Sequence, residues 1–455
     1  MTRSQGAAGA AAAPAVRTAI CADLLDFVGD PGLTDPHSAA VRWRPAHWLL
    51  IGADGRIAAV QPDAPGDDWC KLDHRGRLLM PGFIDSHVHC PQLDVIASWG
   101  TGLLDWLNTY TFPAEARHAD PEVAGAAATL FTDALLAHGT TAAAVFPTVH
   151  LASTEALFAA AAQRGMRLIA GKVLMDRHAP ASLCDDVTGA ERDCEALIAR
   201  WHGHGRLAYA VTPRFAATSS DAQLAMAGRL MARHPGLYMQ THVAENRDEV
   251  AWVARLFPDA RSYLDVYERH GLLGERAVLA HGIWLDDADR ALLHDRGAQI
   301  AFCPSSNLFL GSGLFGWGAA AAAGVNVSLA SDVGGGTSLS MLRTMADGYK
   351  VQALAGQRVT AWALLHAATR GAAVALRLDG EIGSLSPGAM ADLCLWRWAA
   401  GPVAQRRDSL ARGLHERVFA WLTLGDERNC AETWVAGRRR HARADPSATP
   451  TDQEP

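Results

Sequence analysis

The sequence lacks any run of roughly 18 consecutive strongly apolar residues, which a membrane-spanning helix would need. Its start, residues 6–16, is rich in alanine but has no long apolar core and no evident signal-peptide cleavage site. None of the eight cysteines forms a CxxC pair, so we expect reduced, mostly buried thiols. These absences predict a cytoplasmic protein with no membrane partner.

A basic charge balance is also missing. The formal net charge is −7, which argues against nucleic acid as a partner because phosphate binding requires a basic face. Hydrophobic residues make up 49% and charged residues 20%, values that are ordinary for a globular protein with a large core.

At 455 residues the chain is longer than one core usually allows, so we expect a large domain and a smaller one. Short apolar runs separated by turns in 17–80 and again in 380–440 predict one small antiparallel β-sandwich domain built from both chain ends. Residues 81–379 form the predicted central domain. The small and polar segments 1–16 and 441–455 are predicted to be disordered tails.

In the central segment, β-rich runs alternate with helix-like stretches rich in Ala, Leu and Arg. This alternation predicts an α/β protein, either a (β/α)8 TIM-like barrel or a doubly wound open sheet. The eight runs are 82–89, 140–146, 167–173, 207–213, 237–243, 277–282, 299–304 and 326–332.

The positions of polar residues favour the barrel. Six of the eight runs end in a candidate ligand, acid or polar contact, and a barrel brings all the carboxyl ends of its strands to one face. An open sheet would gather only the residues near its switch point. The six runs end in His87-Val-His89, Thr212-Pro-Arg214-Phe215, His242 followed by Glu245, His281, Cys303-Pro304 and Asp332.

His87 and His89 are two residues apart, so they share one face of a strand and form half of a divalent metal site. His242 and Asp332 are the expected third and fourth ligands. Three imidazoles and a carboxylate suit Zn²⁺, while Fe²⁺ and Mn²⁺ remain alternatives. Such an ion lowers the pKa of a bound water to roughly 7 and thereby supplies hydroxide at neutral pH.

Glu245, three residues after His242, is placed to move a proton, although residues 246–249 read as charged surface. His281 can stabilise the attacking oxygen by a hydrogen bond; a fifth ligand or a buried structural histidine are the alternatives. Asp332 can coordinate the metal and also pass a proton to the leaving group.

Six segments follow one another along the chain: PGFIDSHVHCPQ (81–92), LLDWLNTYTFPAE (103–115), VTPRF (211–215), THVAENRDEV (241–250), CPSSN (303–307) and SDVGGGTSLSML (331–342). These segments resemble the amidohydrolase superfamily and, within it, the guanine deaminase family. The HxH motif is shared across the superfamily, whereas the segment 103–115 is much more specific. No lysine is assigned as a carbamylated bridging ligand, which fits a mononuclear site.

The resemblance implies one divalent ion, a guanine substrate and water, with a homodimer as a further expectation by analogy. It implies that His87, His89, His242 and Asp332 bind the metal, with Glu245, His281 and Asp332 catalytic. Gln92, Arg214 and Phe215 would contact guanine, and Trp106 and Tyr110 would cover the pocket. A hydroxide activated by the metal would attack C2, while Glu245 protonates N3, giving xanthine and ammonia.

Two other interpretations stay open at this point. One keeps the mechanism but changes the ring to 8-oxoguanine, a pterin or a triazine. The other is a non-catalytic structural relative that has lost the metal, against which the complete ligand set argues.

Overall fold

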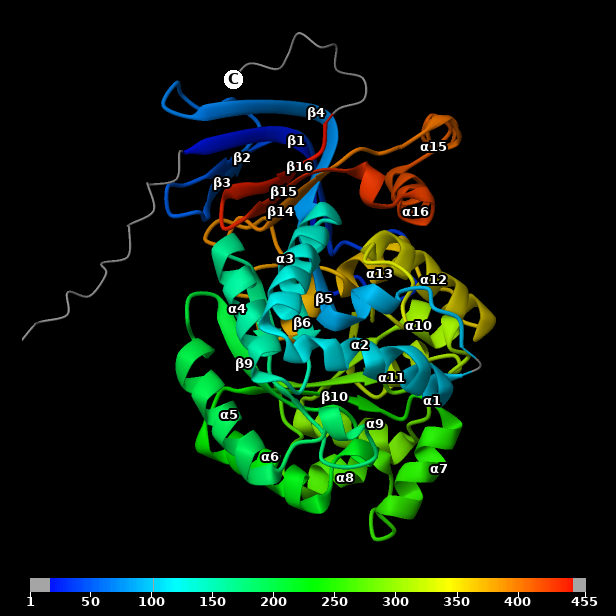
Figure 1. Ribbon diagram of the computed structural model, residues 1–455. Coiled ribbons are helices and arrows are strands. Elements are labelled where there is room, and N and C mark those ends of the chain that lie inside the picture. The colour runs from blue at the N-terminus through cyan, green and yellow to red at the C-terminus, as the bar shows by residue number, and fades with distance from the viewer. Residues whose placement is uncertain (1–16, 101, 445–455) are drawn as a thin grey trace, which may run out of the picture.

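A computed structural model describes residues 17–100 and 102–444 as a barrel with a flanking sheet (Figure 1). Eight parallel strands form the barrel in the spatial order β13-β12-β11-β10-β9-β7-β6-β5, which confirms the predicted (β/α)8 architecture. All eight predicted runs contain a strand. These are β5 (Phe83–His89), β6 (Thr140–Phe146), β7 (Arg167–Ala170), β9 (Leu207–Pro213), β10 (Tyr238–Val243), β11 (Ala277–His281), β12 (Gln299–Phe302) and β13 (Asn326–Leu329).

The first and last strands are joined just beyond the end of β13. The backbone N–H of Asp332 donates to the carbonyl of His87 at 2.9 Å, and the N–H of His89 donates to the carbonyl of Val333 at 2.9 Å. A short strand, β8 (Val173–Leu174), pairs with β9 beside the main path of the sheet. Because the ends of the sheet meet, an open doubly wound sheet is excluded.

Small side chains fill the barrel. Its inner cluster is dominated by alanines such as Ala142, Ala208 and Ala280, together with Ile84 and Ile169. Residues of helix α14 (Arg370–Ala375) and of the segment that follows belong to the same cluster. They close the amino-terminal end of the barrel, where the Tyr238 hydroxyl donates to the carbonyl of Leu376 at 2.7 Å.

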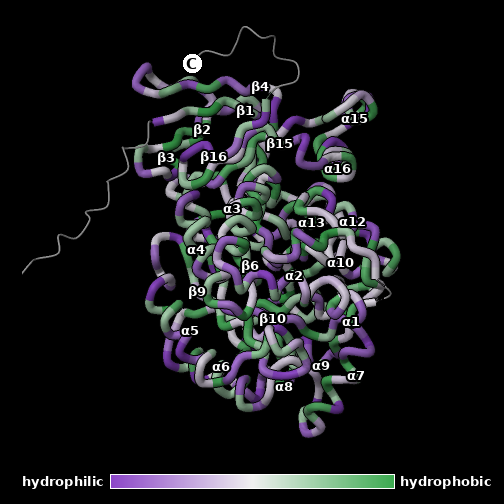
Figure 2. The backbone as a smooth tube through the Cα atoms, in the orientation of Figure 1, coloured by the Kyte–Doolittle hydropathy of each residue, from purple (hydrophilic) through white to green (hydrophobic). Residues whose placement is uncertain are grey.

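Helices surround the strands (Figure 1). Hydrophilic and hydrophobic residues alternate along outer helices such as α5 and α6 (Figure 2), as expected for helices with one buried face. In the part of the chain that the structure describes, no helix has the length and apolar character to cross a membrane. The helices that follow the successive strands from β6 to β13 are α4 (Leu151–Arg164), α5 (Val187–Trp201), α6 (Asp221–Arg233), α7 (Arg247–Leu256), α8 (Tyr263–Arg269), α9 (Asp287–Arg296), α10 (Pro304–Phe309), α11 (Trp317–Ala322), α12 (Met341–Leu354) and α13 (Ala361–Ala367).

The connection between β5 and β6 is long and covers the mouth of the barrel. It begins with a 3-10 helix at Cys90–Val95 and includes a π-helical turn at Leu107–Thr111. The helices of this connection are α1 (Leu103–Trp106), α2 (Phe112–Ala116) and α3 (Pro121–Ala137).

Both chain ends contribute to the flanking sheet, as predicted, and their inward side chains share one core that includes Ile20, Leu49, Leu79 and Leu393. Its strands form one continuous seven-stranded sheet in the order β16-β15-β14-β4-β1-β2-β3. The strands are β1 (Thr18–Phe27), β2 (Val41–Ile51), β3 (Ile57–Gln61), β4 (Cys70–Pro81), β14 (Leu393–Trp396), β15 (Cys430–Val435) and β16 (Arg438–Ala442).

Three details of the flanking region differ from the prediction. The sheet is mixed, because β1 and β4 pair in parallel. Strand β16 runs to Ala442, past the predicted boundary at residue 440, because it pairs with β15 in antiparallel register. Helices α15 (Pro402–Asp408) and α16 (Leu414–Leu424) interrupt the predicted β region. Of the two predicted tails, residues 1–16 and 445–455 lie outside the described residues.

Candidate metal centre and active site

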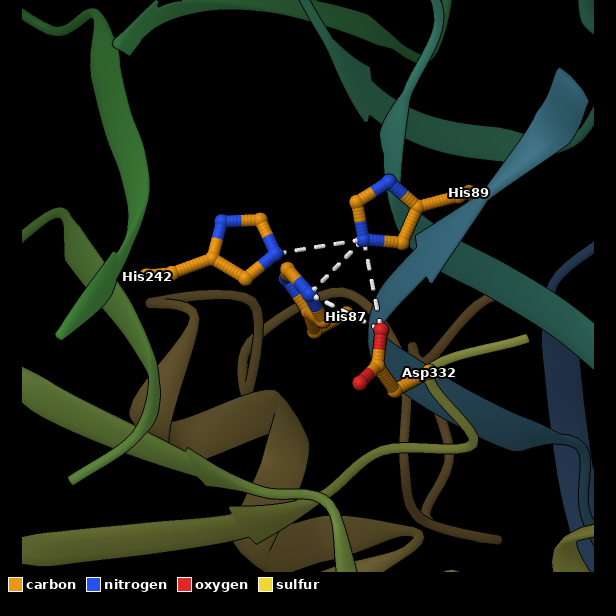
Figure 3. Close-up of side chains that lie close together, drawn as sticks. All are labelled: His87, His89, His242 and Asp332. Carbon is orange, nitrogen blue, oxygen red and sulfur yellow. Dashed lines mark hydrogen bonds and ion pairs between the residues drawn. The ribbon is translucent and has the colours of Figure 1, made fainter. Parts of the chain in front are cut away.

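Four predicted ligands meet at the mouth of the barrel (Figure 3). Nε2 of His89 lies 3.2 Å from Nε2 of His87 and 3.3 Å from Nε2 of His242. Oδ1 of Asp332 lies 3.2 Å from Nε2 of both His87 and His89. The three rings and the carboxylate therefore converge on one small space, although they come from β5, β10 and the segment after β13, which are distant in sequence.

The protonation states of these side chains favour the binding of a cation. Burial lowers the pKa of His89 to about 3, and burial together with the neighbouring imidazoles holds the pKa of His242 well below its usual value. Burial opposes ionisation of Asp332, yet the facing histidines hold its pKa well below the usual range. Neutral imidazoles beside an ionised carboxylate are the protonation states in which these groups coordinate a metal.

Hydrogen bonds from outside the cluster orient two of the ligands. Nδ1 of His242 donates to the carbonyl of Arg214 at 2.6 Å, which leaves the lone pair of Nε2 facing the cluster. Asp85 on β5 accepts hydrogen bonds from the backbone N–H of Ser331, at 3.0 Å, and from the Ser331 hydroxyl. This contact fixes the segment that carries Asp332, whose φ of 49° lies in the left-handed region.

Glu245 lies beside the cluster and is buried. Its Oε1 accepts a hydrogen bond from the Ser312 hydroxyl at 2.9 Å, and its Oε2 lies 3.5 Å from Nε2 of His281. Burial, with a smaller contribution from the charge of Asp332, raises the pKa of Glu245 to about 8. A carboxyl group with a pKa near neutrality can both accept and release a proton.

Of the residues after Glu245 that were predicted to be charged surface, Arg247 and Asp248 are exposed but Glu249 is not. Glu249 is buried, and its Oε2 accepts the backbone N–H groups of Glu245 and Asn246 at 3.0 and 3.2 Å. The Asn246 side chain caps the start of α7, so the two residues form a capping box. This box fixes the backbone of Glu245 at the edge of the cavity.

His281 ends β11 with a φ of 71°, an unusual value for a residue that is not glycine. Its Nδ1 donates to Oδ1 of Asn307 at 2.8 Å, so its Nε2 faces Glu245 and Oδ2 of Asp332, the latter at 3.6 Å. A second possible ligand set combines His281 with Cys303 and Asp332. Burial raises the pKa of the Cys303 thiol well above its usual value, which disfavours a thiolate ligand there.

A cavity opens beside the cluster and collects all the predicted substrate contacts. Gln92, Arg214, Phe215 and Trp106 line it, together with His89, His242, Glu245, His281 and Asp332. The indole N–H of Trp106 donates to the carbonyl of Ser98 at 3.0 Å, so its polar group is already engaged. Tyr110, also expected over the pocket, is not among the lining residues and packs in the cluster around Trp106.

Four buried residues at the site received no role from the sequence: Glu115, Glu249, Asn307 and Ser312. Glu115, Glu249 and Asn307 stand inside the quoted motifs, but only their partners in the fold suggest a role for them. Glu115 accepts hydrogen bonds from both Gln92 and Arg214. The one available signal was a charged or polar residue inside an otherwise apolar stretch, as at Glu115.

Comparisons with known proteins agree with this geometry. Residues 78–440 match the family described as the Amidohydrolase family. Guanine deaminase from Escherichia coli (strain K12) is 46% identical over 366 residues, covering 80% of this chain and 83% of that protein.

Two solved structures are also similar. The guanine deaminase of Bradyrhizobium japonicum superposes with a TM-score of 0.90 at 34% identity, covering 94% of this chain and 100% of the other. The guanine deaminase of C. acetobutylicum, with guanine bound in its active site, superposes with a TM-score of 0.83 at 26% identity, covering 93% and 99%. The chain belongs to the amidohydrolase family, and within it to the group that includes the guanine deaminases.

Proposed function

We propose that this protein is a guanine deaminase, which hydrolyses guanine to xanthine and ammonia in purine catabolism. The observation that carries the proposal is a single cavity that joins the metal cluster and Glu245 to Gln92, Arg214 and Phe215. The activity named for the similar proteins supports the same substrate.

We propose Zn²⁺ as the ion held by His87, His89, His242 and Asp332. The donor set supports this choice, since imidazole nitrogens and a carboxylate oxygen suit zinc. The close approach of the imidazole nitrogens, 3.2 Å between Nε2 of His87 and Nε2 of His89, supports a cation among them. A divalent ion here supplies Lewis acidity that lowers the pKa of water toward neutrality.

The residues around the cluster account for the proton transfers of the proposed reaction. Glu245 takes a proton from the attacking water and delivers it to N3 of guanine, while the water oxygen bonds to C2. Nε2 of His281 accepts a hydrogen bond from that water, because its Nδ1 proton is held by Asn307. Asp332 receives the second proton through Oδ2 and passes it to the departing amine, so the C2–N bond breaks with release of ammonia.

The opposite wall of the cavity suits an oxopurine ring. Arg214 and Gln92 offer N–H donors to the C6 carbonyl, and Phe215 offers an apolar face for the flat ring. We propose these three residues as the guanine contacts, with Trp106 closing the pocket above them.

A panel of substrates tests the function directly. Purified protein loaded with zinc is incubated with guanine, 8-oxoguanine, a pterin and an aminated triazine, and ammonia release is measured for each. We expect guanine to give the highest kcat/KM. If guanine stayed unchanged while another ring reacted, the substrate assignment would be wrong, and a chain that bound no transition metal would support a structural role instead.

Three further proposals concern the protein in its cell. All eight cysteines are free thiols, which supports a reducing compartment and therefore the cytoplasm. Pairing into a homodimer is proposed by analogy with related barrels, and light scattering would decide it.

We also propose that residues 17–80 and 380–440 form a domain separate from the barrel at 81–379, and limited proteolysis would test these boundaries.

A further inference from the structure

Glu115 is a fully buried carboxylate for which the proposed reaction has no role. It lies on α2, within the specific segment 103–115. Its Oε1 accepts hydrogen bonds from Nη1 of Arg214 at 2.7 Å and from Nε2 of Gln92 at 3.1 Å. Its Oε2 accepts from the same Nη1 at 3.0 Å. One carboxylate thus holds both residues that face the C6 side of the proposed substrate.

The amide of Gln92 is held in one orientation. Its Oε1 accepts the backbone N–H of Gly334 at 3.1 Å, while its Nε2 donates to the carboxylate of Glu115. Reversing the amide would point N–H at N–H and oxygen at carboxylate, so these two partners settle the orientation. The second N–H of Nε2 is not used by these partners and is available to the cavity as a donor.

Arg214 is oriented by the same carboxylate. Among the described residues, the Arg214 side chain donates hydrogen bonds to Glu115 alone, and it does so from Nη1. Arg214 also lines the cavity. A guanidinium group can only donate. Both residues therefore have N–H donors available for a ligand, and the Gln92 oxygen is already engaged by the Gly334 N–H.

We propose that Glu115 is a positioning residue that sets the specificity of the site for a ring with a carbonyl, rather than an amino group, opposite Gln92 and Arg214. The inference rests on the proposed function and extends it. A carbonyl oxygen accepts both donors. An amino group there would direct its own N–H groups at them, and a site with unpaired buried donors rejects such a ligand strongly.

The test compares guanine with 2,6-diaminopurine, which keeps the 2-amino leaving group and replaces the C6 carbonyl by an amine. In the wild-type protein loaded with zinc we expect a strong preference for guanine in kcat/KM. In E115Q we expect this ratio to fall roughly ten- to a hundredfold. The fall should arise mainly from a higher KM for guanine, with the bound metal unchanged.

Two companion variants guard against misfolding. E115D keeps the charge but shortens the side chain, so its carboxylate cannot hold both partners, and we expect the same loss of preference. The exposed Glu122 provides the matched control, because E122Q removes a carboxylate at the start of the neighbouring helix α3 and should leave the ratio unchanged. The double variant E115Q/Q92L should lower the ratio by less than the combined effects of the two single substitutions, because both substitutions act on the amide of Gln92.

The outcomes separate the inference from the function on which it rests. If the wild type deaminates guanine and the folded E115Q and E115D variants keep its preference, Glu115 sets no specificity and the inference is overturned. An equal loss on both substrates would assign Glu115 a purely structural role, with the same consequence. If the wild type leaves guanine unchanged, the proposed function fails, and the inference fails with it.

Discussion

Replacing Glu245 by glutamine removes the proposed proton carrier with little change in shape. The amide oxygen can still accept the Ser312 hydroxyl, which lies 2.9 Å from Oε1, and the volume is nearly the same. Proton transfer by a positioned side chain contributes about 100- to 10,000-fold, or about 3–5 kcal/mol of the barrier. We expect E245Q to lose kcat by that factor while KM and bound zinc stay close to the wild-type values.

The assay follows the loss of guanine absorbance and the release of ammonia, with metal content measured on the same samples. E275Q is the matched control, because Glu275 is exposed and precedes β11 at the amino-terminal end of the barrel, opposite the site. A metal-loaded E245Q that keeps more than about a tenth of wild-type kcat would refute the role of Glu245 as proton carrier.

The same substitution should stabilise the chelator-treated protein at high pH. Burial raises the pKa of Glu245 to about 8, so the folded state binds a proton that the unfolded chain has released above its usual pKa of 4.5. The free energy of unfolding then falls as pH rises from 4.5 to 8. Near pH 4, E245Q and the wild type should melt at the same temperature. At pH 8, E245Q should melt at a higher temperature, because its free energy of unfolding should exceed that of the wild type by a few kcal/mol. Equal melting curves at both pH values would contradict this.

Three other substitutions test separate parts of the structure. H242A should abolish tight zinc binding, which elemental analysis measures, and should remove the rise in Tm on adding zinc. R206A should lower the free energy of unfolding by about 3–5 kcal/mol in denaturant titrations, because it leaves buried Asp392 without the paired guanidinium at 2.6–2.9 Å, while KM should not change. N307A should lower kcat about 10- to 100-fold without loss of zinc, because it frees the His281 ring that Asn307 orients; unchanged kcat would show that the bond is dispensable.

The site as a whole resembles other active sites in its distribution of strain and charge. Three residues that are not glycine and lie next to the cavity, Ala244, His281 and Asp332, have φ values between 48° and 71°. Buried carboxyl groups there have divergent pKa values, since that of Glu245 is raised to about 8 and that of Asp332 is held far below its usual range. Two carboxyl groups with opposite shifts fit different resting states, one that holds a proton near neutral pH and one that rests ionised beside the neighbouring imidazoles.

The sequence alone predicted the barrel and the residues of the candidate metal cluster, because both predictions rest on regular periods and on where polar residues fall in them. Side chains two residues apart share one face of a strand, so His87 and His89 pointed to half a metal site before any fold was known. In a barrel all strands end on one face, so His242 and Asp332 could be predicted as ligands from their positions at the ends of two β-rich runs.

Only the tertiary structure decided which residues support that cluster. Glu115 and Arg214 are 99 residues apart, and no local pattern links a helix over the barrel mouth to the end of the fourth barrel strand. The parallel pairing of β1 with β4 and the burial of Glu249 were also hidden, since strand direction and solvent exposure depend on what packs against a segment. The spacing of residues along the sequence predicts which face of a strand or helix a side chain lies on. The residue that this side chain contacts is set only when distant parts of the chain pack together.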